Sequence, residues 1–494
     1  MIEEMTLGGY FMKKLIAAIL CAAVLLSLCA CGNIANDQPE ENLPQQSESE
    51  QNPPVQNEPE EPALPAVTGE RDSVTGVWPE MQAAEFWIAL DDAAEQLRMT
   101  AEECRAYNDS FRNAPSTGIA DLSRYGAELT TVQVMSAMPR GTHPEGNYYI
   151  GNQLIKEEQR EEIRLNSNMA GLTNHEPQYG FLLRSTQLRG FPTDLPLYST
   201  PGDEEFDQCV ETRAKCWEPF VLLHVSTDGL WYLIRTGDYT AWVAAEDTAL
   251  CSREEWDALR QRLEEDFLVV TAPRLSLAGS AACPELAEMT VEMGTRLPLE
   301  PEQPLVDNAT TVHCWSVLLP QADENGQLTT LPVRIPVSED AHEGYLPYTG
   351  ETLLRQAFRL LGQRYGWGGM FSGWDCSSFC QDVYLTMGVR LPRNSGEQSR
   401  SPGRVDISGL SAEERTAKLL EMGPGTLVTM SGHQTMYIGN YDGEPYLLHA
   451  TYGIYDTAGR MQIQNAVVVS SALAFHGNAK SLLNCSHTFV LPEN

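Results

Sequence analysis

A cysteine in the last third of the sequence has the surroundings of a reactive nucleophile. Cys376 directly follows Asp375, and the apolar residues after it recur at helical spacing, so Asp375 is expected to cap a helix whose first turn holds Cys376. Backbone N–H groups and the helix dipole stabilise a thiolate there and can lower a thiol pKa from about 8.5 to near neutrality. The same N–H groups could hold an oxyanion. Cys380, one turn further along, is interpreted as a buried core residue.

Two downstream histidines can supply the proton partner that a thiolate needs. Attack on an amide requires a group that protonates the leaving amine, and imidazole titrates in the right range. The segments 425–430, 434–439 and 446–450 are predicted to be consecutive strands. His433 opens the second strand and His449 lies in the third, so a hairpin can place the two rings side by side. We expect His433 to face the cysteine and His449 to orient it from behind.

The elements before the cysteine must position it. Residues 353–363 have the apolar spacing of an amphipathic helix, and 365–369 (Tyr-Gly-Trp-Gly-Gly) cannot be regular structure. Asp-Cys-Ser-Ser-Phe after Tyr-x-Trp-Gly-Gly, then Gly-His before an apolar strand and His in the next strand, resembles the NlpC family of papain-like cell-wall peptidases. The signature residues occupy about 360–455, and the whole catalytic domain is expected over 350–494.

The resemblance assigns roles to residues of this sequence. Cys376 would be the nucleophile, His433 the general base and acid, His449 the polar orienter, and Tyr365 the tyrosine whose hydroxyl points into the site. It also implies substrate contacts from Asp375, Ser377, Arg393, Ser395, Glu218 and Tyr239. The last two, from an upstream barrel, would close the pocket over the free amine of an N-terminal L-Ala. Asn394 stands where related enzymes usually carry aspartate, which removes a charge from that loop.

Upstream, the chain is expected to form an α+β assembly of several domains. Short alternating runs separated by Gly-containing turns predict a small antiparallel barrel over 176–258, which resembles the bacterial SH3-like repeat of wall enzymes. Residues 266–346 have the same character more weakly and are predicted to be a second, degenerate barrel. Residues 76–175 are expected to be mostly helical: apolar residues from Phe86 to Leu97 fall at helical spacing, and a capping box at Thr100 opens another helix.

The N-terminal segment predicts export. Two lysines precede an apolar run over 15–28, which is too short to span a bilayer comfortably, and Cys29-Ala30-Cys31 follows. Residues 1–31 resemble a lipoprotein signal with Cys31 as the lipidated residue; a soluble secreted protein or an uncleaved signal anchor is the alternative. Residues 32–75 are rich in proline and acidic residues and are expected to be a disordered tether. The chain is therefore expected outside the cytoplasm, on the outer face of the cell membrane.

Composition narrows the classes of partner. With 68 acidic against 33 basic residues the net charge is −35, which excludes a role that depends on coating nucleic-acid phosphates. No Cys-x-x-Cys or His-x-x-x-His frame is present, so neither a zinc site nor a cofactor is expected. Disulfides are possible in an exported protein, with Cys209 and Cys216 a plausible local pair.

These features predict a membrane-tethered cysteine peptidase whose partners are peptidoglycan stem peptides. The family resemblance implies cleavage of the bond between γ-D-glutamate and the L-diamino acid. An inactive wall-binding lipoprotein, or an amidase or acyltransferase on the same frame, would differ in pocket residues or in thiol reactivity.

Overall fold

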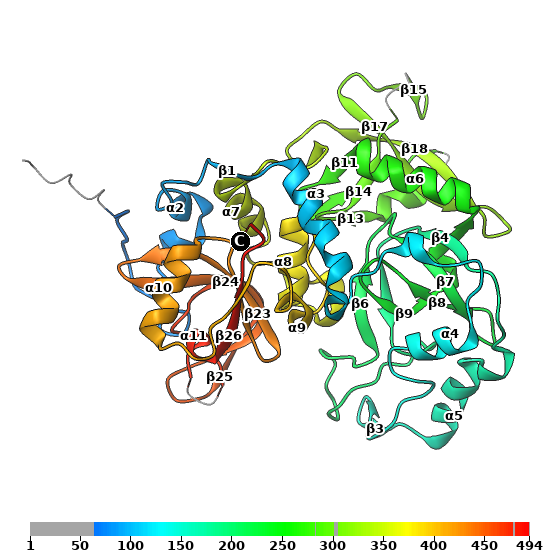
Figure 1. Ribbon diagram of the computed structural model, residues 1–494, viewed down its shortest axis with the longest axis horizontal. Helices are drawn as coiled ribbons and strands as arrows, with labels where there is room; N and C mark the ends of the chain where they lie inside the picture. Colours follow the sequence, from blue (N-terminus) through cyan, green and yellow to red (C-terminus); the bar gives the residue numbers. More distant parts are fainter. Residues whose placement is uncertain (1–63, 282, 301–304, 478–479, 494) are drawn as a thin grey trace, which may run out of the picture. The chain divides into compact units, whose positions relative to one another are not determined.

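The computed structural model describes residues 64–281, 283–300, 305–477 and 480–493 (Figure 1). The predicted signal with Cys31 and the tether up to residue 63 lie outside the described residues. Among the helices within these ranges, none combines the length and the apolar character needed to cross a membrane.

The C-terminal region is built on a six-stranded antiparallel sheet in the order β21-β26-β22-β23-β24-β25 (Figure 1). Its strands are β21 (Arg404–Asp406), β22 (Leu427–Met430), β23 (His433–Tyr441), β24 (Glu444–Tyr455), β25 (Met461–Ser471) and β26 (Ser486–Val490). The associated helices are α7 (Gly350–Arg359), α8 (Cys376–Leu385), α9 (Ser395–Gln398), α10 (Ala412–Met422) and α11 (Leu482–Cys485). The predicted strands and the helix opening at Cys376 are thus confirmed.

Alternation along the central strands buries both faces of this sheet. Met436 and Ile438 of β23 pack in one core with residues of α7 and α8, whereas Tyr437 packs in a second core with residues of α10 and α11. Burial on both faces fixes the register, because a slip of one residue would exchange the two faces. Helix α7 ends at Arg359, short of the predicted end at 363, and Gly362 follows with φ 77°.

A seven-stranded antiparallel sheet forms the first barrel, in the order β10-β4-β7-β8-β9-β5-β6. Its strands are β4 (Gln178–Leu182), β5 (Thr186–Arg189), β6 (Val210–Ala214), β7 (Pro219–Val225), β8 (Trp231–Arg235), β9 (Thr240–Ala244) and β10 (Thr248–Cys251). The proposed pairing of Cys209 with Cys216 is wrong, since both thiols are free. The extended strand β6 separates them by roughly 20 Å of chain, far beyond the 4.4–6.8 Å that a disulfide spans between Cα atoms.

Helix α6 (Arg253–Glu265) leads into a second β-rich region. A three-stranded sheet, β14-β11-β19, is accompanied by the pairs β12-β13, β15-β16 and β17-β18. The strands are β11 (Phe267–Val270), β12 (Arg274–Ser276), β13 (Thr290–Glu292), β14 (Arg296–Pro298), β15 (Leu305–Val306), β16 (Ala309–Thr310), β17 (Cys314–Ala322), β18 (Leu328–Pro336) and β19 (Ala341–Glu343). The turn expected at Asn325-Gly326 joins β17 to β18.

The N-terminal segment is less helical than expected and divides between two cores. Its elements are α2 (Ala84–Ile88), β1 (Leu97–Met99), α3 (Ala101–Ser110), α4 (Thr131–Ala137), β2 (Tyr149–Ile150), β3 (Gln153–Leu154) and α5 (Glu157–Asn166), with β1 paired to β20 (Tyr348–Thr349). The capping box at Thr100 is confirmed. The helix predicted from Phe86 to Leu97 is wrong beyond Ile88, because the Asp91 carboxylate accepts the N–H of Ala93 (3.0 Å) and stabilises a turn instead.

The first part of this segment completes the core beneath the C-terminal sheet. Trp87 is fully buried, its ring centroid lies 5.1 Å from that of Tyr446, and a side chain at Gly439 would meet it at 2.8 Å. Leu122, Leu129 and Val134 instead belong to the core of the barrels.

The predicted tether ends earlier than expected. Residues 64–75 lie against the C-terminal sheet: the Tyr441 hydroxyl donates to the carbonyl of Pro65 (3.1 Å), and the N–H of Ser471 donates to the carbonyl of Thr75 (2.7 Å). Val67 and Val74 pack against the two cores of that sheet. Burial of these two valines offsets the conformational entropy lost when the segment becomes ordered. From the polar composition we had expected that entropy cost to prevail.

Candidate active site

Cys376 is the first residue of α8, and Asp375 caps the helix. The Asp375 carboxylate accepts the N–H of Ser378 (2.9 Å), and the Ser378 hydroxyl accepts the N–H of Asp375 (3.0 Å). The thiol faces β23, since the backbone N–H groups of Gln434 and Ser377 both act on it to lower its pKa. The nucleophile is thereby held between a helix start and a central strand.

The expected low pKa of this thiol is not found. Burial raises the pKa of Cys376 to about 12, the neighbouring Asp375 carboxylate raises it further, and the N–H groups and Arg393 compensate only in part. The helix start stabilises a thiolate, but desolvation beside an anion opposes it more strongly. The resting nucleophile is therefore a neutral thiol that must lose its proton during reaction.

His433, His449 and Ser470 form a single file of side chains behind the thiol. Nε2 of His433 lies 2.9 Å from Nδ1 of His449, and Nε2 of His449 lies 2.9 Å from the Ser470 hydroxyl. These three residues are 7%, 1% and 0% exposed, so water does not compete for these hydrogen bonds. The structure thus brings the two predicted histidines together, while Ser470 of β25 is a partner that the sequence analysis did not identify.

Both histidines of this file are held neutral. Burial lowers the pKa of His433 well below its ordinary value, and His449 and His476 lower it further. Burial likewise lowers the pKa of His449 to about 3, with a contribution from His476. When His433 donates from Nε2 to His449, its Nδ1 is left unprotonated and able to accept the thiol proton.

His476 is a further residue of the site that the sequence analysis missed. Its ring stacks on His433, with centroids 5.6 Å apart and planes inclined by 10°. It follows β25 in a turn where its N–H donates to the carbonyl of Lys480 (2.8 Å). No local sequence pattern indicates which way this turn folds, so the sequence does not predict that His476 reaches His433.

Tyr365 stands in an aromatic group close to the thiol. Burial raises the pKa of Tyr365 well above its ordinary value, and the nearby Cys376 and Asp375 raise it further, so its hydroxyl stays protonated as a donor. Phe206, from the β5–β6 loop of the first barrel, lies 6.2 Å from Tyr365, 6.1 Å from Trp367 and 5.1 Å from Tyr452 between ring centroids. This group joins the barrel to the C-terminal sheet beside the nucleophile.

The Phe206 loop is also held by charge. Arg364 donates to both carboxylate oxygens of Glu205, at 3.0 and 2.8 Å. Both contacts come from Nη2, so one arginine nitrogen is shared between the two carboxylate oxygens. The loop is therefore anchored directly beside Tyr365.

Asp375 and Arg393, both predicted to contact the substrate, form a buried clamp with each other. Nη2 of Arg393 donates to Asp375 at 2.5 Å, Nη1 donates to Ser377 at 3.0 Å, and Nε donates to Thr212 of β6. Burial alone would raise the pKa of Asp375, but the Arg393 guanidinium holds it below its ordinary value. Asp375 and Arg393 are 7% and 4% exposed, so this clamp is buried between the helix start and strand β6.

Two glycines in the motif before the cysteine allow the first barrel to pack closely against it. A side chain at Gly368 would lie 2.8 Å from Val210, and one at Gly369 would lie 2.5 Å from the Cβ atom of Arg213. Both glycines have positive φ, 55° and 84°, which other residues adopt at a cost. The Gly-Gly pair therefore lets strand β6 pack directly against the segment that leads to the thiol.

Tyr239 reaches the site, but its acidic partner is Glu211 and not Glu218. The Tyr239 hydroxyl donates to Glu211 at 2.6 Å, and Arg140 also pairs with Glu211. Burial raises the pKa of Tyr239 well above its ordinary value, and Glu211 raises it further. Glu218 stands beyond a sharp turn at Trp217 (φ 63°) and lines a cavity that neither Cys376 nor Tyr239 lines, so the structure does not bring Glu218 and Tyr239 together.

Asn394 and Ser395 begin the short helix α9. Asn394 caps it through Glu397, to which its side chain donates at 3.0 Å, and Ser395 is its first residue. Gln398 of the same helix donates to the carbonyl of Ser377 at 3.0 Å. The missing aspartate is thus replaced by a helix cap, and α9 braces the start of α8.

This arrangement has the parts for nucleophilic acyl transfer without a metal ligand set. It presents a thiol, a neutral imidazole with a fixed orientation, and a protonated tyrosine. In the part of the chain that the structure describes, no group of three or more His, Cys, Asp or Glu side chains could hold a metal ion.

Comparison with known proteins identifies two domains. Residues 362–468 match the NlpC/P60 family, and residues 196–244 match the SH3 domain of SH3b1 type. The chain therefore carries an NlpC/P60 domain and an SH3b domain, as the motifs predicted.

Curated relatives are named as peptidases. The chain is 28% identical over 180 residues to the gamma-D-glutamyl-L-lysine dipeptidyl-peptidase of Bacillus cereus, covering 36% of this chain and 49% of the relative. It is 34% identical over 100 residues to the probable endopeptidase p60 of Listeria welshimeri, covering 20% and 17%. The matches thus span half or less of these relatives' own length.

A solved structure has a similar overall fold. An NlpC/P60 endopeptidase from Photobacterium damselae subsp. piscicida matches with a TM-score of 0.66 at 18% identity, over 87% of this chain and 99% of that one. The likeness extends well beyond the NlpC/P60 domain, so the arrangement of the upstream elements is shared as a fold.

Proposed function

We propose that this protein is a cysteine peptidase that cleaves peptidoglycan stem peptides between γ-D-glutamate and the L-diamino acid. The observation that carries the proposal is the hydrogen-bonded file of His433, His449 and Ser470, with 2.9 Å between the histidine nitrogens, beside a thiol that faces Gln434 of the same strand. Such a file provides a nucleophile and one oriented base that can later act as an acid. The names of the relatives support the choice of bond.

In the first step, Nδ1 of His433 accepts the proton of the Cys376 thiol as the sulfur attacks the γ-carbonyl of D-glutamate. The carbonyl oxygen becomes an oxyanion, for which the Tyr365 hydroxyl and the first N–H groups of α8 are the available donors. His433 then gives its proton to the nitrogen of the diamino acid as the C–N bond breaks, leaving a thioacyl enzyme. Water, deprotonated by the same imidazole, hydrolyses the thioester and restores the thiol.

The first barrel recognises the N-terminal end of the substrate. Glu211 is an anion within hydrogen-bonding distance of Tyr239 and is placed by β6, which packs on the segment before Cys376. A carboxylate there favours a substrate with a free N-terminal ammonium, such as a stem peptide that begins with L-Ala. N-acetylation of that amine should then reduce cleavage strongly.

Incubation of the purified chain with a stem tripeptide, with mass spectrometry of the products, tests the reaction. Cys376→Ala should reduce release of the L-Ala-γ-D-Glu dipeptide by about 10³-fold or more. Cys380→Ala removes a thiol one turn along the same helix and should keep activity within a few fold. Undiminished release by Cys376→Ala would refute the mechanism, and release of other fragments would refute the assigned bond.

We also propose that Cys31 is lipidated and holds the protein on the outer face of the cell membrane. The support is the sequence alone, a short apolar run that ends in Cys-Ala-Cys. Mass spectrometry of the mature N-terminus and membrane fractionation test it. Cys31→Ser should release the protein from the membrane fraction, whereas Cys29→Ser should not.

A further inference from the structure

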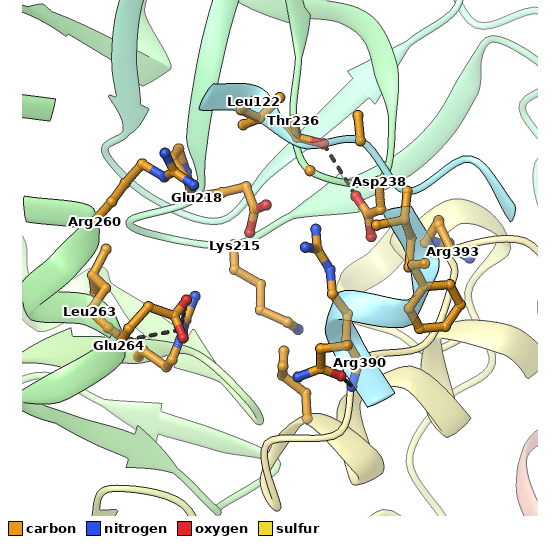
Figure 2. Close-up of a pocket in the computed structure, with 18 of the residues that line it drawn as sticks. Leu122, Lys215, Glu218, Thr236, Asp238, Arg260, Leu263, Glu264, Arg390 and Arg393 are labelled. Carbon is orange, nitrogen blue, oxygen red and sulfur yellow. Dashed lines mark hydrogen bonds and ion pairs between the residues drawn. The ribbon is translucent and has the colours of Figure 1, made fainter. Parts of the chain in front are cut away.

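A hollow borders the Arg393 clamp. It is a cavity of about 590 Å³ between α3, α6, the β6–β7 turn, the β8–β9 turn and the loop after α8 (Figure 2). Thr212 and Arg393 line it, but Cys376, His433 and Tyr239 do not. Its volume is within the roughly 300–1,000 Å³ typical of small-molecule sites.

Most charged groups on its wall already have partners. Lys215 pairs with Asp382 at 2.8 Å, Arg296 pairs with Glu264 at 2.6 Å, and Arg112 pairs with Asp109 at 3.1 Å. Asp238 accepts from Gln381 at 2.8 Å. These charged groups are therefore paired with other protein groups and do not need a ligand in the cavity to balance them.

Among the charged groups that line the cavity, Glu218, Arg390 and the exposed Arg105 have no such partner within the described residues. Figure 2 shows the Glu218 carboxylate and the Arg390 guanidinium directed toward each other across the hollow. Among the described residues neither side chain has an ion pair or hydrogen bond, and the two groups do not pair with each other. The guanidinium packs on Gly237, where a side chain would come within 2.0 Å of Nη2, so it is directed from the NlpC/P60 domain onto the barrel.

Opposite charges that face one cavity without touching leave room for a molecule that carries the complementary pair. An unpaired, partly buried charge is costly, and a bound counter-charge would offset that cost for both residues. Leu122 and Leu263 add apolar surface beside them (Figure 2). The wall thus matches a small ligand with an ammonium at one end, a carboxylate at the other and a short chain between them.

We propose that this cavity binds a small zwitterion, a free amino acid or a short peptide, with its ammonium on Glu218 and its carboxylate on Arg390. Such a ligand would bridge the barrel, which carries Glu218, and the NlpC/P60 domain, which carries Arg390. Occupancy should therefore stabilise the folded protein. The proposal does not require the proposed peptidase reaction, because no residue of the thiol–histidine file lines the cavity.

Titration of Glu218 gives the proposal a pH signature. Burial and the neighbouring Asp238 raise the pKa of Glu218 to about 7, although Arg390, Arg296 and Lys215 partly oppose the rise. Below that pH the carboxylate becomes protonated and no longer attracts an ammonium. Affinity for a zwitterion should therefore fall as the pH decreases from 8 to 6.

Calorimetric titration of the full-length Cys376→Ala protein with glycine, diglycine and triglycine tests the proposal. Removal of the catalytic thiol prevents turnover and leaves the cavity unchanged. At least one of the three probes should bind at pH 8. Its N-acetylated form, which lacks the ammonium, and its amide, which lacks the carboxylate, should each bind at least tenfold more weakly. No binding by any probe, or equal binding by either blocked form, would overturn the proposal.

Variants locate the site. Glu218→Gln and Arg390→Gln should each weaken binding of the zwitterion at least tenfold, and Glu218→Gln should also abolish its dependence on pH between 6 and 8. Glu254→Gln, an exposed change on the same helix as Arg260, is the matched control and should bind normally. Unchanged affinity in both cavity variants would place the ligand elsewhere and refute the assignment.

Discussion

The polar groups on the two sides of the thiol differ in charge. On the sheet side, His433, His449 and Ser470 are uncharged groups in single file, each hydrogen-bonded to the next. On the barrel side, Asp375, Arg393 and Glu211 are charged groups held in clamps. The side that transfers protons carries no formal charge at rest, whereas the side proposed to read the substrate does.

This contrast has a physical reason. A base that must accept a proton works best when it is neutral at the operating pH, and burial among other imidazoles ensures this. Recognition of a charged substrate end requires a fixed counter-charge, which stays ionised only if neighbours support it. Each environment would fail at the task of the other.

The largest effect that would test this contrast is expected on the sheet side. His449→Ala removes the partner of Nε2 and leaves His433 free to turn or to change tautomer, so kcat should fall by about 10- to 100-fold with little change in KM. Steady-state kinetics on a stem tripeptide measure this. His313→Ala, an exposed histidine, is the control. A rise in KM that accounts for the whole loss of activity would assign His449 to substrate binding. It would also remove the difference between the two sides of the thiol.

On the barrel side, Glu211→Gln should act on recognition. Loss of the carboxylate should lower kcat/KM by about tenfold for a stem peptide with a free amine, mainly through KM, and leave an N-acetylated peptide unaffected. Competition assays with both peptides give the ratio. Glu246→Gln, exposed in the same barrel, should change neither. A uniform loss on both substrates would mean that Glu211 supports the fold alone.

His476→Ala tests whether the stacked ring of His476 helps to keep His433 neutral. Without the stacked ring, His433 becomes more hydrated and loses a neighbour that lowers its pKa, so that pKa rises. Because the reaction needs neutral His433, the acid limb of kcat/KM should move to higher pH, with a loss of several fold near pH 5.5. A fall of equal size at every pH would show only a packing role.

The smallest expected effect concerns stability. The pKa of Glu218 is about 7 in the folded protein and close to 4.5 when unfolded. Between these values the folded state holds the extra proton, so the contribution of Glu218 is complete below about pH 4.5 and is lost as the pH rises through 7. Relative to wild type, Glu218→Gln should therefore gain a few degrees of Tm from pH 5 to pH 8.

Thermal unfolding at several pH values measures this difference, with Glu254→Gln as control. The buried histidines act in the opposite direction, since their lowered pKa values make the folded state lose stability as the pH falls below about 6.5. A Tm difference that does not vary with pH would show that Glu218 titrates normally.

Local pattern predicted the elements that carry the chemistry. The cap at Asp375, the start of α8 and the hairpin that pairs His433 with His449 all follow from spacing within a few residues. The high pKa of the thiol did not follow, because a sequence shows where a helix begins but not how deeply its first turn is buried. Ser470 and His476 were missed for a related reason, since their positions depend on strand register and on the path of one turn.

The pairing of Tyr239 with Glu211, and not with Glu218, was missed for the same reason. Glu211 and Glu218 are seven residues apart, and only the packing of β6 against Gly368 and Gly369 decides which one reaches Tyr239. Arg393 was likewise recognised as part of the site but assigned to the substrate, because a sequence does not reveal that Asp375 and Thr212 occupy its donors.

The buried tryptophan of the N-terminal segment bears on how this gene can be cut and recombined. Trp87 packs against Gly439, where even a methyl group would collide with it. A fragment that begins at residue 350 would leave a ring-sized void beneath β23, the strand that carries His433. The stretch that matches a family is thus shorter than the stretch that must be transplanted. A chimaera that borrows the NlpC/P60 domain needs the segment around residue 87 as well, or a new side chain to fill its place.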